Sequence, residues 1–567
     1  MKQLLVLAAF LAIVNANPKD CNPEWWKNML LYQIYPRSLK DSNGDGIGDI
    51  QGIISKMDHF SDLNVDALWL SPFYPSPLYD MGYDISDFVD VDPTYGTLKD
   101  FKELVDATHE RGMKLMVDFV PNHTSDEHDW FKKSIQKIHP YTEYYTWRKG
   151  QVLPNGTVTY PNNWKSTYNG PGWVYVEERG EYYFHQFSKK QVELNYNSTY
   201  LREAMEGVLK FWLDMGVDGF RIDAAPYYYE NQSFLDEPLS GLTDDPNSYY
   251  YTDKIYTRDQ PETYELVHSW RTLLDKYSVK TGCSKALIVE AYANTTLTMD
   301  YYKIGSIPFN FDFIDNVNRN STGSDVARYL QGWMTQMPDG ETANWVSGNH
   351  DNRRLVSRFG KNRARIIMTM IFLLPGVAVV YNGDEIGMED TILSWEETKD
   401  NEACNAGKEN YLLHTRDPAR TPFQWDDTTS AGFSTSPETW LPVNSNYVTL
   451  NLANEIPVKD SFYNLVKFLS KLKETLSANE DKVDVKILNE NVVAFSRHTK
   501  DKKIIYVVAN FGDQKETVDS KDFITEPDKH VSYTITPTNN ISAESHFTTG
   551  DKLIIPPQTG LILTNEA

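Results

Sequence analysis

Residues 114–123 read Lys-Leu-Met-Val-Asp-Phe-Val-Pro-Asn-His, a mostly apolar run that ends in polar side chains. Short apolar runs of this kind alternate along the chain with longer amphipathic segments. The strands of a parallel sheet read in this way because both faces of the sheet are buried. The pattern predicts eight strands: Leu30–Tyr35, Ala67–Leu70, Lys114–Val120, Gly219–Ile222, Ala286–Val289, Phe309–Phe313, Asn344–Ser347 and Val377–Val380.

Segments with helical periodicity separate these runs. The expected helices are Asp49–Leu63, Leu98–Arg111, Arg202–Met215, Thr263–Tyr277, Asp325–Met337, Asn362–Leu374 and Ser461–Thr475. Strands that alternate with helices in this number predict an α/β fold, the TIM (β/α)8 barrel. A doubly wound open sheet is the alternative that the pattern alone leaves open.

Two stretches depart from this rhythm. Residues 124–198 are rich in Tyr, Trp, Asn, Gly and Pro, so we expect an inserted subdomain between strand 3 and helix 3. From residue 482 the apolar residues alternate with period two, which predicts a C-terminal antiparallel β-sandwich domain over 482–567. The barrel would then comprise residues 17–123 and 199–481, with an irregular excursion over 391–445 between the eighth strand and its helix.

The composition limits the classes of partner. The chain has 567 residues, and the 40% that are hydrophobic suffice for a substantial core. Its net charge of −24 argues against nucleic acid or an anionic bilayer as a partner, because like charges repel. Lys2 and the apolar run behind it predict a signal peptide over residues 1–16. No later segment reads as a membrane span or a lipid-anchor signal, so we expect a secreted, soluble protein.

Cysteines and sequons add to this expectation. Cys21, Cys283 and Cys404 allow at most one disulfide bond, and their spacing does not suggest zinc. Asn-x-Ser/Thr sequons are glycosylation candidates in a secreted chain, and they begin at Asn155, Asn197, Asn231, Asn294, Asn320 and Asn540. A seventh sequon, at Asn122, lies at a strand end where we do not expect a glycan.

Polar side chains gather where the predicted strands end, and that face of a barrel carries the catalytic residues. Singly, each residue is better explained as a cap or a salt-bridge partner. Together they predict a polar pocket with several carboxylates. The third, fourth, fifth and seventh strands end in Asp118 with Asn122-His123, in Arg221 with Asp223, in Glu290, and in Asn349-His350-Asp351.

Several carboxylates in a dry cleft are what the cleavage of a glycosidic bond needs. One must stay protonated to donate to the leaving oxygen, and burial raises a carboxyl pKa for that role. Another must stay ionised to attack the sugar or to activate water. Arg221 lies two residues from Asp223, so both point to the same face of the strand and Arg221 would hold Asp223 ionised.

These four strand ends resemble the signature regions of the α-amylase glycoside hydrolase family, and in particular its α-glucosidase branch of maltases and oligo-1,6-glucosidases, most closely the secreted insect maltases. The resemblance covers essentially the whole mature chain. It implies a retaining double displacement with Asp223 as nucleophile, Glu290 as general acid/base and Asp351 as the carboxylate that binds ring hydroxyls. His123 and His350 match hydroxyl-binding histidines, and Arg221 matches the nucleophile's partner.

Further matches concern the substrate pocket. Asp80 and Tyr83 resemble the acid and the stacking tyrosine that close the subsite for the non-reducing glucose. Arg416 and Arg420 resemble the arginines of the exo-acting branch, and Arg416 would pair with Asp80. Phe187 and Gln191 resemble pocket-lining residues, although the segment reads Gln-Val-Glu-Leu-Asn over 191–195 where the family often has Gln-Pro-Asp-Leu-Asn.

The residue after the nucleophile bears on the linkage. Ala224 is small, and in this branch a small residue accompanies α-1,4 and sucrose-type substrates, whereas Val accompanies α-1,6 substrates. The resemblance therefore implies hydrolysis of maltose, sucrose and short malto-oligosaccharides, with no organic cofactor.

Residues 41–49 read Asp-Ser-Asn-Gly-Asp-Gly-Ile-Gly-Asp, with oxygen donors at alternate positions and glycines that allow a tight turn. Such hard donors suit Ca²⁺, although Gly52 stands where the bidentate Glu of an EF-hand would fall. A turn without a metal is the alternative. Related α-glucosidases hold a structural Ca²⁺ in this loop, which implies the ligands Asp41, Asn43, Asp45, Asp49 and the carbonyl of Ile47.

Other readings remain open at this stage. A transglucosidase, a sucrose isomerase or an oligoglucosidase that prefers α-1,6 linkages would use the same residues. Heavy chains of amino-acid transporters keep the barrel but lose the catalytic carboxylates and carry a membrane helix, and this chain keeps Asp223, Glu290 and Asp351. Asp80 and Arg416 argue against an endo-acting amylase, and a second role as a receptor is not excluded.

Overall fold

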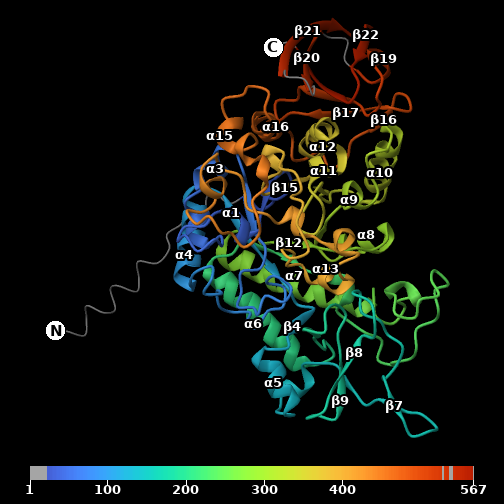
Figure 1. Cartoon of the computed structure of the whole chain (residues 1–567). Helices are drawn as coiled ribbons and strands as arrows, with labels where there is room; N and C mark the ends of the chain where they lie inside the picture. Colours follow the sequence, from blue (N-terminus) through green and yellow to red (C-terminus); the bar gives the residue numbers. More distant parts are fainter. Residues whose placement is uncertain (1–21, 526–528, 536–540, 566–567) are drawn as a thin grey trace.

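A computed structural model describes residues 22–525, 529–535 and 541–565. Its centre is a sheet of eight parallel strands (Figure 1), whose order is β13-β12-β11-β3-β2-β1-β15-β14. Chain-order neighbours pair except for β13 and β14, and β1 pairs with both β2 and β15. The strands are β1 Leu30–Ile34, β2 Ala67–Leu70, β3 Lys114–Phe119, β11 Gly219–Ile222, β12 Ala286–Val289, β13 Ile307–Pro308, β14 Asn344–Val346 and β15 Val377–Tyr381.

The sheet closes on itself. Asn310, just after β13, forms a parallel bridge with Trp345 of β14, and the backbone N–H of Asn310 donates to the carbonyl of Asn344 at 2.8 Å. This bridge joins the two ends of the strand order, β13 and β14. The sheet is therefore a closed barrel and not a doubly wound open sheet. The TIM-barrel prediction is therefore confirmed.

Side chains of the strands alternate between two cores. Leu31, Trp69 and Met116 belong to a cluster inside the barrel, whereas Leu30 and Leu115 belong to the larger cluster between the strands and the surrounding helices. This period of two places alternate residues of a strand on the inner face.

The helices behind the strands form the outer layer of the barrel. Local signals set their ends. Thr97 caps α4 in a reciprocal capping box with Asp100, and Gly216 ends α6 in a left-handed conformation. These helices are α2 Ile50–Ile54, α3 Met57–Asp62, α4 Leu98–Glu110, α6 Thr199–Met215, α7 Pro261–Thr281, α8 Thr295–Lys303, α10 Gly323–Gln336, α12 Lys361–Leu373 and α16 Phe462–Thr475.

The sixth strand lies earlier in the chain than predicted. β13 ends at Pro308, and the last two residues of the predicted strand, Asp312 and Phe313, belong to the one-turn helix α9 (Asp312–Asp315). The side-chain oxygen of Asn310 accepts the N–H of Asp312 at 2.8 Å, which turns the chain out of the sheet. The expectation of a strand over Phe309–Phe313 is therefore wrong, although Phe309 and Phe311 are buried in the barrel core.

An insertion between β3 and α6 forms a separate unit at the end of the barrel opposite the C-terminal domain (Figure 1). Its short strands make three small antiparallel sheets. Trp164, Trp173 and Phe184 form a small aromatic core of their own. The elements of this unit are β4 His123–Ser125, α5 Asp129–Ile135, β5 Trp147–Arg148, β6 Gln151–Val152, β7 Val158–Thr159, β8 Trp173–Val176, β9 Glu181–Phe184 and β10 Gln191–Glu193.

The excursion after β15 is irregular apart from short helices, among them α13 (Asn401–Ala406) and α14 (Tyr411–His414), and α15 (Leu452–Glu455) follows it. It is tied to the loop after β1, because the N–H of Asp41 donates to the carbonyl of Phe433 at 3.0 Å and the hydroxyl of Ser434 donates to Asp41 at 2.5 Å. It therefore belongs to the barrel's carboxyl-terminal face.

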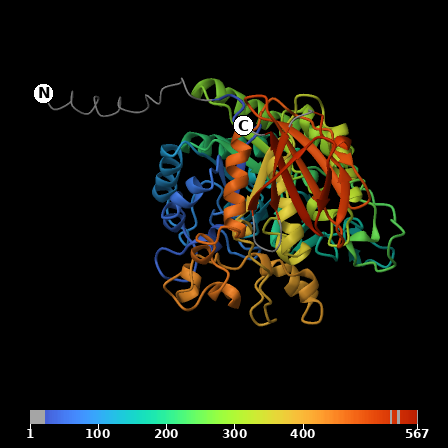
Figure 2. The same ribbon diagram turned by 90° about the horizontal axis from the view of Figure 1, so that it is seen from above.

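The C-terminal strands form a six-stranded sheet and a two-stranded sheet. Along β17, Val492 and Ala494 pack between the two sheets, whereas Val493 and Phe495 pack against the barrel helices. Figure 2 shows the larger sheet beside α12. The prediction of an antiparallel β region is confirmed, although the period-two pattern did not indicate β19 or β21. The strands are β16 Lys486–Ile487, β17 Val492–His498, β18 Ile504–Asn510, β19 Glu516–Asp519, β20 Lys529–Ile535, β21 Ile541–Thr548, β22 Lys552–Ile555 and β23 Thr559–Asn565.

Among the described residues, no helix has the length and apolar character that a membrane crossing requires. The predicted signal peptide over 1–16 lies outside the described residues.

Gly376, in the turn between α12 and β15, generates a prediction about stability. Its φ is +108°, and an added Cβ would lie 2.2 Å from the carbonyl oxygen of Ala343, a backbone atom that cannot rotate away. Gly376→Ala should cost more than the roughly 1 kcal/mol that positive φ alone costs a non-glycine residue. Denaturant unfolding followed by tryptophan fluorescence measures this free energy.

Gly112→Ala is the matched control, because Gly112 also lies in a helix-to-strand turn at φ +76° but has nothing within 4 Å of its Cβ position. Equal losses in the two variants would contradict the steric argument.

Candidate active site

One cavity of about 740 Å³ opens at the carboxyl ends of the barrel strands. Its walls come from the barrel, the inserted unit and the excursion. Nine of the twelve residues predicted for catalysis and substrate binding line it: Asp80, Tyr83, His123, Phe187, Gln191, Asp223, Glu290, Asp351 and Arg416. The other three, Arg221, His350 and Arg420, contact these residues directly.

Arg221 joins the carboxylates. Its Nη1 lies 2.6 Å from Oδ1 of Asp223 and 3.0 Å from Oδ2 of Asp118, and its Nη2 lies 2.7 Å from Oε1 of Glu290. All four side chains are buried. The parity of the strands explains the cluster, because these residues occupy inward-facing positions on β3, on β11, and just after β11 and β12.

Burial and neighbouring charges shift the pKa values of these carboxyls by different amounts. Burial raises the pKa of Glu290 to about 8, because the nearby Asp223 and Asp351 charges add to it and Arg221 offsets only part. Burial also raises the pKa of Asp223 to about 6, and Arg221 limits the rise. At neutral pH Glu290 is therefore mostly protonated while Asp223 is mostly ionised.

Asp351 behaves in the opposite way. Burial opposes its ionisation, but His350 and the guanidinium groups of Arg420 and Arg416 hold the pKa of Asp351 well below its usual range. Burial lowers the pKa of His350 to about 3, so His350 is neutral at pH 7 and the two arginines supply the positive charge. Arg420 lies 2.8 Å and Arg416 3.3 Å from Oδ1 of Asp351.

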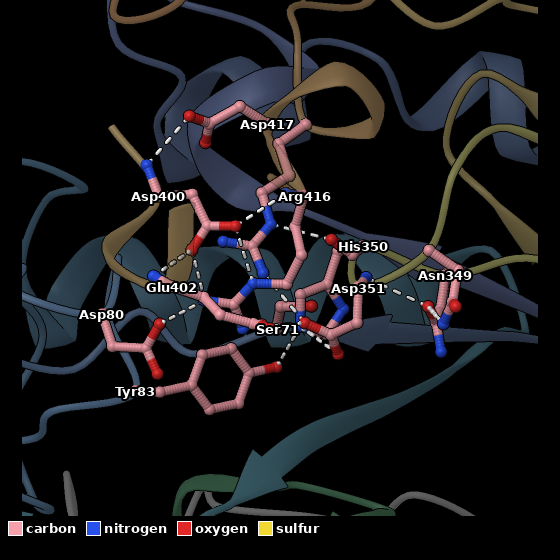
Figure 3. Close-up of polar contacts among 12 residues, drawn as sticks. Ser71, Asp80, Tyr83, Asn349, His350, Asp351, Asp400, Glu402, Arg416 and Asp417 are labelled. Atoms are coloured by element: carbon pink, nitrogen blue, oxygen red, sulfur yellow. Dashed lines mark hydrogen bonds and ion pairs between the residues drawn. The ribbon is translucent and has the colours of Figure 1, made fainter. Parts of the chain in front are cut away.

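A network around Arg416 forms part of the cavity wall (Figure 3). Its Nη2 lies 2.8 Å from Oδ1 of Asp80 and 2.6 Å from Oδ1 of Asp400, and its Nε donates to Oδ2 of Asp400 at 3.0 Å. The backbone N–H of Asp400 donates in turn to Asp417 at 2.8 Å. The ion pair between Arg416 and Asp80 that the resemblance implied is present.

The inserted unit contributes to the same wall. The amide nitrogen of Gln191 lies 3.0 Å from Oδ2 of Asp80 and 3.0 Å from Nε2 of His123. Phe187 packs edge-on against His123, with ring centroids 5.6 Å apart. Tyr83 stacks on His350 with ring planes 2° apart, and its hydroxyl donates to Asp118 at 2.9 Å.

Asp400 and Tyr168 were not among the predicted site residues. Asp400 is buried and forms a two-pronged ion pair with Arg416, and Tyr168 lines the cavity 3.5 Å from Asp80. Asp400 lies in the irregular excursion, where no periodicity gives the direction of a side chain. Asp118 was noted at a strand end without a role, and its parity with Arg221 and Asp223 was the available signal.

Ala224 follows Asp223 in the left-handed conformation, with φ +53°, and lines the cavity. Its N–H donates to Oε2 of Glu290 at 2.9 Å. The left-handed turn therefore points a backbone donor at this carboxyl.

The side chains of Asp41, Asn43, Asp45 and Asp49 in the loop over 41–49 carry oxygen atoms that could act as metal ligands. The carboxylate of Asp41 accepts the N–H groups of Asn43, Gly44 and Gly46, and Asp49 caps α2. Among the described residues, no group of three or more His, Cys, Asp or Glu side chains is arranged to hold a metal ion. The donor chemistry of the loop nevertheless suits Ca²⁺.

The sequons and cysteines lie in different environments. Asn122 is buried and donates to Glu193 at 2.7 Å, which leaves no room for a glycan. Cys283 is disulfide-bonded, and Cys404 is a free, exposed thiol. Asn540 lies outside the described residues. Asn231 is half-buried, whereas the exposed candidates are Asn155, Asn197, Asn294 and Asn320.

A closed (β/α)8 barrel with three carboxylates, an arginine and two histidines at its strand ends defines a glycoside hydrolase. Residues 33–480 match the family model of the α-amylase catalytic domain, and the chain belongs to the α-amylase family. It is 51% identical to an α-glucosidase of Apis mellifera, over 93% of each chain.

Two further comparisons extend this result. The chain is 43% identical to a salivary α-glucosidase of Anopheles gambiae, over 87% of this chain and 85% of that protein. The solved structure of the α-glucosyl transfer enzyme XgtA superposes with a TM-score of 0.84 at 29% identity, over 96% of this chain and all of that one.

The two raised pKa values generate a prediction about pH. If Asp223 is the nucleophile, it must be ionised to attack, so kcat/KM for glycoside hydrolysis should fall as the pH drops below about 6. If Glu290 is the general acid, it must be protonated to donate, so kcat/KM should also fall as the pH rises above about 8. The pH profile of kcat/KM measures both limbs.

Asp118→Asn tests the cause of the acid limb. The charge of Asp118 raises the pKa of Asp223, so its removal should move that limb to lower pH. A shift of the limb to higher pH would refute this assignment.

Proposed function

We propose that this protein is an exo-acting, retaining α-glucosidase that releases terminal α-1,4-linked glucose from maltose and short malto-oligosaccharides and the α-linked glucose of sucrose. The observation that carries the proposal is the Asp80–Arg416 ion pair in the cavity wall, which would block that side of the cavity to further sugar units. A cavity with one closed end admits the end of a sugar chain but not its interior. The curated relatives named α-glucosidase support the same activity.

The chemistry follows from the two shifted carboxyls. The ionised Asp223 attacks the anomeric carbon while the protonated Glu290 donates its proton to the leaving oxygen. A water molecule then gives its proton to the Glu290 carboxylate and attacks the same carbon, which releases Asp223. One guanidinium bridges both carboxyls, so they lie close together, as in retaining enzymes, where the separation is about 5–5.5 Å.

Other groups orient the glucose ring. Asp351 stays ionised under the two arginines and would accept hydrogen bonds from ring hydroxyls. Burial lowers the pKa of His123 to about 4, so both histidines are neutral at pH 7 and would act as hydrogen-bonding groups. Because both histidines are buried and held by neighbouring side chains, such contacts strengthen as charge develops in the transition state.

Transfer of the glucosyl group to another sugar is the second candidate, because hydrolysis and transfer share the covalent intermediate. The likeness to XgtA, described as an α-glucosyl transfer enzyme, favours it.

The small side chain of Ala224 lies beside the proposed nucleophile. In the family branch that the chain resembles, a small residue at this position accompanies α-1,4 linkages, so it supports α-1,4 over α-1,6 cleavage.

The test is a time course of products from maltose, isomaltose, sucrose and soluble starch, with Asp223→Asn as a control. We expect glucose from maltose and sucrose, little from isomaltose or starch, and a rate loss of roughly 10⁴-fold or more in the variant. Preferential cleavage of isomaltose would refute the role of Ala224. A folded wild-type protein without activity on any of these sugars would refute the proposed α-glucosidase activity.

The same proposal extends to the protein's environment. We propose that it is secreted and glycosylated at some of its exposed sequons. Relatives are named salivary enzymes, and Asn155, Asn197, Asn294 and Asn320 are accessible. Mass spectrometry before and after enzymatic removal of N-glycans identifies the occupied positions.

We further propose that the 41–49 loop binds a structural Ca²⁺ through Asp41, Asn43, Asp45, Asp49 and the carbonyl of Ile47. Five hard oxygen donors within one glycine-containing loop support this assignment. The ion would add stability rather than chemistry, because these residues do not line the catalytic cavity.

If the loop binds Ca²⁺, the melting temperature should fall on treatment with EDTA and recover with CaCl₂. Saturation to about 100-fold above Kd would contribute about 2.7 kcal/mol. Asp45→Ala should remove the response, whereas Asp244→Asn, an exposed position outside the loop, should keep it. An unchanged melting temperature in the wild-type protein would exclude the site.

A further inference from the structure

Two buried carboxyls that the proposed chemistry does not use lie where the inserted unit meets the barrel. Glu193 belongs to β10 of the inserted unit and is 1% exposed. Glu230 lies in the loop after β11 of the barrel and is 3% exposed. Neither residue lines the catalytic cavity. A carboxyl is seldom buried so fully without a partner, so each of them needs an explanation.

The two carboxyls are partners of each other. Their side chains form a hydrogen bond, and two carboxylates have no hydrogen to place between them, so this contact needs one carboxyl proton. Oε1 of Glu230 is buried, and no N–H or hydroxyl group of the described residues donates to it. Burial raises the pKa of both carboxyls, and the charge of Glu230 raises the pKa of Glu193 further. The pair therefore keeps a proton at neutral pH.

Two other titratable groups face the pair, and neither replaces this proton. Arg148 acts on Glu230 from a distance, since its guanidinium lies over the ring of Phe234, 3.6 Å from the centroid. Burial raises the pKa of Tyr196 well above its usual range, and its hydroxyl donates to the carbonyl of Pro121 at 2.6 Å. Tyr196 is therefore neutral and is engaged elsewhere.

Glu193 is connected to the cavity through Asn122. The amide nitrogen of Asn122 donates to Oε1 of Glu193 at 2.7 Å and to the carbonyl of Tyr227 at 2.9 Å. Both amide hydrogens are thus used, and the amide oxygen faces Nδ1 of His123 at 2.9 Å. Glu193 also lies opposite His123 in the pairing of β10 with β4. The orientation of a ring that lines the cavity is therefore set from behind by a carboxyl.

We propose that Glu193 and Glu230 share one proton and act together as positioning residues for His123. The proton leaves the pair with a single negative charge, so Glu193 accepts from Asn122 while the inserted unit stays joined to the barrel loop. Without it, two negative charges would repel each other across this junction. The inference rests on the proposed function only for the role of His123. Position 193 is also where the sequence has Glu in place of the Asp that is common in the family.

The shared proton is tested by stability against pH. Glu230→Gln gives Glu193 a permanent N–H donor in place of the proton. Glu230 has an ordinary pKa of 4.5 in the unfolded chain and about 8 in the folded protein. The folded protein thus holds the proton more tightly, so the wild type loses stability as the pH rises from about 5 to about 8, and the variant lacks this loss.

The melting temperature of Glu230→Gln should therefore rise relative to that of the wild type across this pH range. Glu178→Gln is the control, because Glu178 is an exposed carboxyl of the same inserted unit, and it should follow the wild type. A difference between Glu230→Gln and the wild type that stays constant with pH overturns the shared proton.

The positioning role is tested by a double-mutant cycle on kcat/KM for maltose. Glu193→Leu removes the acceptor for Asn122 and should lower kcat/KM about tenfold. If Glu193 acts through His123, the same substitution should cost little in a His123→Asn protein, because the ring that it positions is already gone. Losses that multiply would indicate general damage and overturn the role. Glu193→Gln keeps an oxygen for Asn122 and should lose less than Glu193→Leu, and equal losses would also contradict the proposal.

These measurements separate the inference from the proposed function. The melting temperatures need no turnover, and calorimetry of maltose binding to the same variants replaces kcat/KM if the protein cleaves no sugar. A shared proton and coupled losses of binding in such a protein would support the inference and refute the hydrolase. Cleavage of maltose without the pH-dependent difference and without the coupling would refute the inference alone.

Discussion

The site depends on a single buried guanidinium. Arg221 lies within 3.0 Å of oxygens from Asp118, Asp223 and Glu290, and water reaches almost none of them. Three carboxylates could not share this space without a positive charge, because the repulsion between them would add to the cost of burial. One arginine cannot neutralise three carboxylates, however. A bound proton therefore supplies part of the missing positive charge. It resides mainly on Glu290, whose pKa rises the most of the three.

The contrast with Asp351 shows how one cavity supports opposite ionisation states. Glu290 is buried and Asp351 is half-buried, and the pKa of the first is raised whereas that of the second is lowered. The difference lies in the partners. Glu290 shares its arginine with two other acids, whereas Asp351 is contacted by two arginines, Arg416 and Arg420. The ratio of cations to carboxylates, and not burial alone, sets each group's state.

Periodicity predicted the parts of the molecule that repeat. The strands of the barrel and of the C-terminal sheet were recovered because alternating or continuous apolar runs record which faces are buried. The sixth strand was misplaced because Phe309 and Phe311 are buried by the barrel core after the strand has ended. Strand β19 was missed because, of its four residues Glu-Thr-Val-Asp, only Val518 is buried.

The candidate site was predicted in two ways. Strand parity alone placed Arg221 beside Asp223, whereas the pairing of Asp80 with Arg416 came from the family resemblance and no local pattern encodes it. Asp400 escaped both, because it lies in an irregular segment whose conformation depends on contacts with Arg416 and Asp417. Residues fixed by tertiary contacts leave no periodic signal.

The wall of the cavity joins Asp80 to a partner 336 positions later in the chain. During synthesis, Asp80 therefore leaves the ribosome long before Arg416 has been made. Asp223 and its neighbours on the strands can be synthesised while the pocket still lacks this wall. The selectivity for chain ends that we propose is thus completed only once the excursion after the eighth strand has been synthesised and has docked.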